Sequence, residues 1–379
     1  MNFTFRKAMV HIQDITNYLE QWAPLCYQED YDNSGLLVGD PHQAVTGILI
    51  CLDVTEAVIA EAVQTGCNLI IAHHPLIFPA IKHITKSTHT GRCIMQAIKH
   101  DIAIYAMHTN LDNIATGING HMATRLNLQQ QHILQPKPHT LQRLTVYVPM
   151  ESVDEVRDAL HAAGAGQIGN YNRCSFRTAG TGTFQPNDMA TPTIGKRGSL
   201  EQFEEYKLEV IYPAYLSRNI ITAMQKAHPY EEVAYLIQPL GNQNHQVGAG
   251  MIGELETALD THAFLAYLKD TMQLQHIRHS VPNHNNIKRV ALCGGAGISL
   301  LPEALKNGAD AFITADVKYH NFCDAAEKIL LVDIGHYESE VGMKQLLHSN
   351  LSEQYKTIRL LISQSTSNPV CYFPCNVSS

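Results

Sequence analysis

Histidine and acidic side chains occur in three groups, each directly after a predicted β-strand. The groups are His73 with His74, His108 with Asp112, and His336 with Glu340. In an open α/β sheet, ligands bind beside the carboxyl ends of the parallel strands. We therefore expect the three groups to meet at such an edge and to form a single site.

The side-chain types in these groups are those of a metal centre. Imidazole and carboxylate groups without thiolates suit Zn, Mn, Fe, Co or Ni, and differ from the cysteines of a structural zinc site. His336 and Glu340 are four residues apart at the start of a predicted helix, which places both on one face. Five or six ligands exceed the need of one tetrahedral zinc. Two divalent metal ions per chain, about 3.5–4 Å apart with a bridging carboxylate and water, would use them and would equip the site for hydrolysis.

Each group taken alone also has a structural explanation. His73 and His74 could be buried histidines with satisfied hydrogen bonds, and Asp112 could cap a helix. His336 and Glu340 could form an ion pair on a solvated helix face. The occurrence of all three groups at strand ends favours the metal interpretation.

Two other stretches follow predicted strands. LCGGAG (292–297) indicates a Gly-rich turn between a strand and a helix, which serves either phosphate binding by backbone N–H groups or tight packing. TADVKYH (314–320) places Asp316, Lys318 and His320 after a strand, where they form either a helix cap or a wall of the site.

The elements that must position these residues alternate between strand and helix. Strands are expected at 46–54, 68–72 and 102–107, with helices between them, and the same alternation resumes after residue 250. This pattern is typical of an α/β layer with a largely parallel sheet. A Gln- and Pro-rich connector is expected at 128–140.

The middle of the chain has a different order of elements. From residue 143 to about residue 239 the pattern reads β-α-β-β-α-β, a ferredoxin-like unit. The sequence thus predicts an α/β body of two halves, residues 1–135 and 248–379, interrupted by an inserted α+β domain at 140–245.

Composition narrows the class of protein. The 379 residues predict two or three domains, and the 16% charged residues favour an oligomer. A net charge of −8 without a strongly basic stretch disfavours direct nucleic-acid binding, because phosphates are held by clustered positive charge. The N-terminus lacks the apolar core of a signal peptide, and no membrane span is expected. Nine scattered cysteines without a CxxC pair fit reduced thiols, so we expect a cytoplasmic protein.

Six stretches resemble, in order, signatures of the NIF3 (NGG1-interacting factor 3-like) family. They are YDNSGLLVGDP, CLDVTEAVIAEA, NLIIAHHPLIF, HTNLDN, GADAFITADVKYH and DIGHYESE. The middle segment resembles the PII/CutA-like insert of longer bacterial members, most clearly in AHPYEEVAY (227–235). Tyr31 replaces a usual Trp, and Ala315 stands where Gly is common. Neither departure touches a predicted ligand.

The resemblance implies a dinuclear metal site and its ligands. The family's ligand positions match His73, His74, Asp112, His336 and Glu340, while His108 matches a histidine that is either a ligand or a support for one. It also implies that the strand ends before His73. Pro75 disfavours helix at His74 and blocks further pairing, so the two histidines can turn toward one cavity and serve one metal each. Members form toroidal homohexamers with metal sites facing an internal cavity.

The resemblance leaves two functions open. The first is a metal-dependent hydrolase like GTP cyclohydrolase 1 type 2, acting on a nucleotide or a related ring or phosphoester. In the GTP version, hydroxide held at the metals attacks purine C8 and formate is released, and His108 or His320 could move protons. The alternative is a non-enzymatic regulatory hexamer that binds metal or a small ligand.

Overall fold

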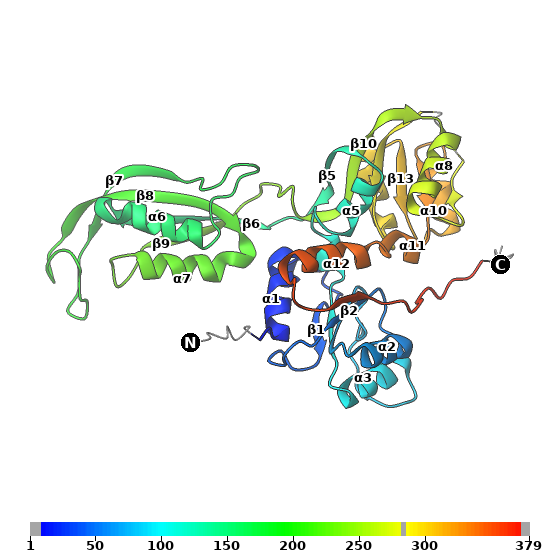
Figure 1. Cartoon of the computed structure of the whole chain (residues 1–379). Helices are drawn as coiled ribbons and strands as arrows, with labels where there is room; N and C mark the ends of the chain where they lie inside the picture. The colour runs from blue at the N-terminus through cyan, green and yellow to red at the C-terminus, as the bar shows by residue number, and fades with distance from the viewer. Residues whose placement is uncertain (1–8, 282–285, 373–379) are drawn as a thin grey trace, which may run out of the picture. The chain divides into compact units, whose positions relative to one another are not determined.

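A computed structural model describes residues 9–281 and 286–372 of the chain. The chain forms two compact units (Figure 1). One unit, here called the body, comprises the residues up to Pro136 together with those from His245 onward. The other, here called the insert, is Lys137–Asn244. Residues 1–8, which belong to the N-terminus where we predict no signal peptide, lie outside the described residues.

The first sheet of the body has five strands in the order β1-β4-β3-β2-β15. Their bounds are Gly35–Val38 (β1), Ala103–Ala106 (β4), Leu69–Ala72 (β3), Ile48–Cys51 (β2) and Leu360–Ile362 (β15). The last four are mutually parallel, and only β1 pairs antiparallel. β15 comes from the C-terminal end of the chain and pairs with β2, so the chain returns to the N-terminal sheet (Figure 1).

The second sheet of the body has six strands in the order β11-β14-β13-β12-β10-β5. Their bounds are Arg278–His279 (β11), Leu330–Asp333 (β14), Ala311–Thr314 (β13), Ile287–Leu292 (β12), Gly248–Leu259 (β10) and Gln129–Pro136 (β5). Strands β12, β13 and β14 are parallel. The α/β fold predicted for both halves is confirmed.

The connector predicted at 128–140 is wrong for most of its length, because β5 lies there and pairs antiparallel with β10. Only Ile133 and Leu134 of β5 are buried, and the glutamines around them are mostly exposed. An edge strand with so little apolar surface has the composition of a loop, which explains the error.

Helices cover both sheets. Their bounds are Ile12–Trp22 (α1), Glu56–Thr65 (α2), His89–Lys99 (α3), Thr109–Asp112 (α4), Ile118–Arg125 (α5), Thr261–Met272 (α8), Leu301–Lys306 (α9), Tyr319–Ala325 (α10), His336–Glu340 (α11) and Met343–Gln354 (α12).

One apolar core contains Ile50 and Ile71 of the first sheet, Ile313 and Val332 of the second, and Leu347 of α12. This shared core holds the two sheets together, so strand ends from both halves can contribute to one site.

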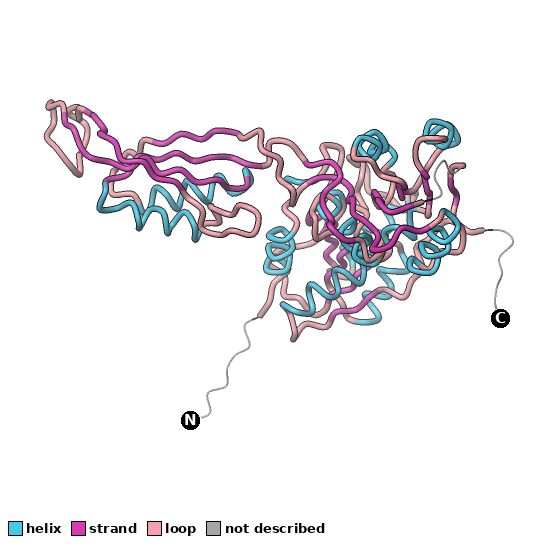
Figure 2. The backbone as a smooth tube through the Cα atoms, turned by 90° about the horizontal axis from the view of Figure 1, so that it is seen from above, coloured by secondary structure: helices cyan, strands magenta, loops and turns pink. Residues whose placement is uncertain are grey.

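The insert has the order β-α-β-β-α-β. Its elements are Leu141–Pro149 (β6), Val153–Ala162 (α6), Phe176–Phe184 (β7), Glu201–Pro213 (β8), Ser217–Ala227 (α7) and Tyr235–Pro239 (β9). The strands form an antiparallel sheet in the order β7-β8-β6-β9, and both helices cover one face of it (Figure 2). Alternate residues such as Leu144, Val146 and Leu208 point into the core beneath the helices.

Short 3-10 helices complete the fold at Leu25–Tyr27, Met150–Ser152, Ala214–Leu216 and Ile298–Leu300. No helix in the described part of the chain combines the length and apolar character needed to cross a membrane.

Candidate metal centre

His73 and His74 follow β3 directly, where the strand has ended. β3 ends at Ala72, and the backbone N–H groups of both histidines donate to the carbonyl oxygen of Leu52, at 3.1 and 3.0 Å. This shared acceptor turns the chain away from the extended conformation, so side-chain alternation no longer applies. The two rings lie 5.0 Å apart and face the same site.

His108 and Asp112 lie on the next strand end of the same sheet. β4 ends at Ala106, and His108 is the N-cap residue of the single-turn helix α4, which ends at Asp112. The His108 ring is 5.1 Å from that of His73. Asp112 Oδ1 lies 3.8 Å from His73 Nε2, so the carboxylate faces the histidines.

The third pair comes from the second sheet and supplies the centre of the site. β14 ends at Asp333, and α11 begins at His336 and ends at Glu340. The buried Glu340 carboxylate has its Oε2 3.0 Å from His74 Nε2 and 3.1 Å from His336 Nε2. Its Oε1 lies 3.8 Å from His73 Nε2. One carboxylate therefore contacts imidazoles from both halves of the body, as a bridging ligand would.

Each of the four histidines uses its Nδ1 atom for a hydrogen bond to the protein. The acceptors are the Met107 carbonyl for His73 (2.7 Å), Asp53 for His74 (2.6 Å), Asp32 for His108 (2.7 Å) and Asp316 for His336 (2.7 Å). With the proton on Nδ1, the lone pair of a neutral imidazole is on Nε2. Carboxylates that orient histidines in this way are the usual support of metal ligands.

Two of these supporting residues were not among the predicted site residues. Asp53 lies two residues beyond the end of β2, so the strand-end rule could have found it. Asp32 belongs to a polar turn that carries no strand signal, and it reaches His108 from 76 residues away. Asp316, predicted as a cap or a site wall, bonds to His336.

The electrostatics of the site fit a divalent cation. Burial raises the pKa of Asp112 to about 7, and the Glu340 carboxylate adds to that shift. Burial alone would lower the pKa of His74, but hydrogen bonds with Asp53 and Glu340 raise it to about 10. The hydrogen bond with Glu340 raises the pKa of His336 to about 9. The carboxylates gathered around the buried Glu340 thus require positive charge beside them, either as protons on histidine or as a metal ion.

The donor atoms are also spaced for metal binding. His73, His74 and His108 form one group, and His74, His336 and Glu340 form a second, with the ligand atoms of each group within 4.8 Å of one another. His73 Nε2 is fully buried and has no hydrogen-bond partner. A buried polar atom without a partner is costly, and coordination of a metal would satisfy it.

Comparison with known proteins identifies the relatives of this chain. The sequence model of Duf34/NIF3 (NGG1p interacting factor 3) matches residues 10–369. The chain belongs to the DUF34/NIF3 family. It is 38% identical over 368 residues to a Bacillus subtilis protein named "GTP cyclohydrolase 1 type 2 homolog", covering 96% of this chain and 99% of the relative. A relative of the same name from Halalkalibacterium halodurans is 38% identical over 365 residues, or 95% and 98% of the two chains.

Solved structures of similar proteins share the fold of this chain. A Bacillus cereus protein related to NIF3 has a TM-score of 0.86 and 38% identity, with 97% of this chain and 100% of that one covered. A Staphylococcus aureus protein has a TM-score of 0.77 and 30% identity, with 97% and 99% covered.

The Gly-rich turn of this DUF34/NIF3 protein serves packing against the site. The N–H groups of Gly294 and Gly295 donate to Asn119 Oδ1 and Ser339 Oγ, at 2.8 and 2.9 Å. A Cβ atom at Gly295, where φ is +60°, would lie 2.2 Å from Glu340 Oε1. The phosphate alternative is therefore wrong for these N–H groups, and the turn instead lets backbone approach the central carboxylate.

A cavity of about 350 Å³ opens beside the histidines. The residues that line it include His74, His336, Arg278, Tyr337 and Tyr372. His320 is exposed on α10 and its ring contacts Tyr319. No contact described in the structure joins His320 to the cluster around Glu340.

Proposed function

We propose that this DUF34/NIF3 protein is a dinuclear-metal-dependent hydrolase like GTP cyclohydrolase 1 type 2, acting on a nucleotide or a related ring or phosphoester. The observation that carries the proposal is the convergence of three Nε2 atoms on the Glu340 carboxylate, with every Nδ1 atom already bonded. The residues that would hold two divalent metals are His73, His74, His108, Asp112, His336 and Glu340.

When bound, a pair of divalent metals lowers the pKa of water and stabilises negative charge on the substrate, which is the chemistry of hydrolysis. The chain supplies the rest. Asp53 and Asp316 orient the rings of His74 and His336 beside the cavity. The Glu340 carboxylate lies 3.0 and 3.1 Å from Nε2 of His74 and His336, one imidazole from each half, and so sets the spacing of the two ligand groups. His108 joins the ligands in this proposal, and the exposed His320 receives no role in it.

The neighbouring cavity supports an anionic, ring-bearing substrate. Arg278 lines it with its side chain 61% exposed, so its guanidinium is accessible even though it also pairs with Asp333 at 3.1 Å. Tyr337 and Tyr372 present rings in the same cavity. A cation for a phosphate and aromatic faces for a base are the groups that recognise a nucleotide.

The test is a metal analysis and a nucleotide panel on purified protein. We expect two metals per chain after reconstitution, and metal-dependent release of formate or phosphate from GTP or another nucleotide. His74→Ala should abolish turnover, whereas His320→Ala, which removes a histidine outside the cluster, should leave it unchanged. Absence of turnover with every nucleotide in the fully metal-loaded protein would contradict the enzymatic proposal.

We further propose that the protein assembles into homohexamers and works in the cytoplasm. Exposed apolar side chains support the assembly: Tyr31 and Phe78 are in ring contact, and Ile81 and Ile84 are exposed in the loop beyond Phe78. Exposed apolar side chains of this kind, in a chain with only 16% charged residues, are typical of an interface. Light scattering after size-exclusion chromatography measures the assembly, and a monomer at micromolar concentration would contradict it.

A second function is favoured by one observation, a separate cavity in the insert. It supports the alternative that the protein is a regulatory hexamer that binds a small ligand. If the metal-loaded protein shows no turnover but the insert binds a ligand, this alternative replaces the hydrolase.

A further inference from the structure

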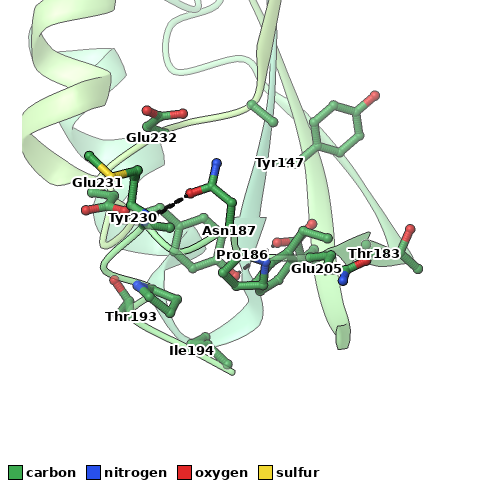
Figure 3. A pocket seen from close by; sticks show the side chains of 17 residues that line it. Tyr147, Thr183, Pro186, Asn187, Thr193, Ile194, Glu205, Tyr230, Glu231 and Glu232 are labelled. Atoms are coloured by element: carbon green, nitrogen blue, oxygen red, sulfur yellow. Dashed lines mark hydrogen bonds between the residues drawn. The ribbon is translucent and has the colours of Figure 1, made fainter. Parts of the chain in front are cut away.

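The insert contains a cavity of about 740 Å³ that is separate from the metal-type residues of the body (Figure 3). Strands β6, β7 and β8 form its floor, and the loops that follow β7 and precede β9 form its sides. Its volume is within the range of small-molecule sites.

Aromatic rings line much of this cavity. Tyr147, Phe184 and Tyr230 contribute to its walls. Phe184 stacks on Phe203 with ring centroids 5.8 Å apart, and its ring lies 6.3 Å from that of Tyr230. These contacts hold the Phe184 ring in place, so the cavity has a preformed aromatic wall.

A carboxylate lies at the base of the cavity. Glu205 is only 9% exposed, and the Tyr230 hydroxyl donates to its Oε1 at 3.1 Å. Among the described residues, none donates a hydrogen bond to its Oε2. A Cβ atom at Gly182 would lie 2.2 Å from that oxygen, so glycine on β7 leaves the space that the carboxylate occupies. Because Glu205 lines the cavity, this oxygen is open to accept a hydrogen bond from a ligand that enters it.

The charge of the lining is entirely negative. Glu231 and Glu232 lie together at one side of the cavity, away from Glu205, and none of the described residues that line the cavity is Lys, Arg or His. Lys207 pairs with Glu209 at 3.1 Å, whereas Arg197 donates to the carbonyl of Ala190, a lining residue, at 2.8 Å and is a cation beside the cavity. The three carboxylates of the lining outnumber this one cation, so the lining attracts positive charge.

We propose that the insert's cavity binds a small organic cation, a primary amine or a guanidinium compound. Such a cation would place its charge between the aromatic faces and donate to Glu205 Oε2. A bare metal ion fits less well. In the described part of the chain, groups of three His, Cys, Asp or Glu residues spaced for a metal occur in the body, and Glu205 belongs to none of them. The proposal does not depend on the hydrolase activity of the body.

Calorimetric titration of the full-length protein with agmatine and with putrescine tests this proposal. Both should bind with one site per chain, whereas 1,4-butanediol, which has the length of putrescine without its charge, should not. Glu205→Gln keeps an oxygen for the Tyr230 hydroxyl and removes the charge, and should weaken binding about tenfold or more. Glu232→Gln, at an exposed position on the cavity wall, should weaken binding by a smaller factor and serves if Glu205→Gln does not fold.

Glu204→Gln is the matched control. Glu204 precedes Glu205 on β8, is exposed, bonds to Thr181 at 3.2 Å and does not line the cavity. Its replacement should leave amine binding unchanged. The proposal is overturned if neither amine binds at millimolar concentration, if the diol binds as well as putrescine, or if Glu204→Gln weakens binding as much as Glu205→Gln. A zinc stoichiometry that falls in Glu205→Gln would assign the cavity to a metal instead.

Discussion

The body and the insert each surround a buried glutamate, and the two surroundings differ in kind. Glu340 is 3% exposed and meets the Nε2 atoms of three histidines. Glu205 is 9% exposed and meets one tyrosine hydroxyl beneath aromatic rings. Imidazole nitrogens are lone-pair donors for metals, whereas ring faces attract cations without coordinating them. The partners of a buried carboxylate, more than the carboxylate itself, thus indicate which cation a site takes.

The largest effect is expected from the centre of the body's site. Glu340→Gln removes the negative charge that all three imidazoles face. Metal affinity should therefore fall by more than about 100-fold, which exceeds the loss typical when a residue that only supports a ligand is replaced. Metal content by mass spectrometry after dialysis measures it. Glu205→Gln is the corresponding change in the insert and should retain both metals. Equal loss of metal in the two variants would contradict the proposal that Glu340 belongs to a metal site and Glu205 does not.

The supporting aspartates should have an intermediate effect. Asp53→Asn leaves His74 in place but weakens the bond that holds its proton on Nδ1, so metal affinity should fall about 10- to 100-fold. Asp324→Asn, an exposed change on α10, is the control and should have no effect. A competition titration with a chromogenic chelator gives both affinities. An unchanged affinity in Asp53→Asn would mean that His74 is not held for a metal.

Removing metal should make the stability of the protein depend on pH in a defined direction. The pKa of His74 is raised from 6.5 to about 10 and that of His336 to about 9, by the carboxylates around them. A group whose pKa is raised by folding stabilises the folded state fully at pH values below its pKa in the unfolded chain. This contribution is lost as the pH rises through the pKa of the group in the folded protein. Chelated protein should therefore lose several degrees of Tm between about pH 7 and pH 10.

The metal-loaded protein should show a smaller change over the same range, because a metal replaces the protons on Nε2. Thermal unfolding of both forms at pH 7 and pH 9.5 makes the comparison. An equal change of Tm with pH in the chelated and the metal-loaded forms would contradict this, because it would show that metal does not replace the protons of the histidine cluster.

The smallest effect on the body is expected from a change in the insert. Gly182→Ala adds a Cβ that must displace the Glu205 carboxylate, so agmatine should bind several-fold more weakly. Metal content and turnover should stay the same. Altered metal content in this variant would show that the two sites are linked.

The sequence predicted the alternation of strands and helices well wherever a strand is buried and a short loop follows it. The strand expected at 102–107 is β4, Ala103–Ala106, whose residues are all fully buried. β5 and β15 were missed for a common reason. β5 is largely exposed and rich in glutamine, and β15 has only three residues, all partly buried. Such edge strands depend on pairing with distant partners, which local composition does not encode.

The candidate site follows the same rule. Histidines and acids directly after buried strands were visible as a pattern, because strand ends share one edge of a sheet. The support of His108 by Asp32 was not visible, since it arises only when a polar turn folds against α4. The pairing of His336 with His74 across the two halves likewise depends on the shared core.

The central claim is that the Nε2 atoms gathered around Glu340 hold two metals. Anomalous diffraction from crystals of the protein loaded with zinc or manganese tests it most directly. The account predicts two peaks about 3.5–4 Å apart, bridged by Glu340 and bound through Nε2 of His73, His74 and His336. A single peak, no peak, or coordination through Nδ1 would contradict it.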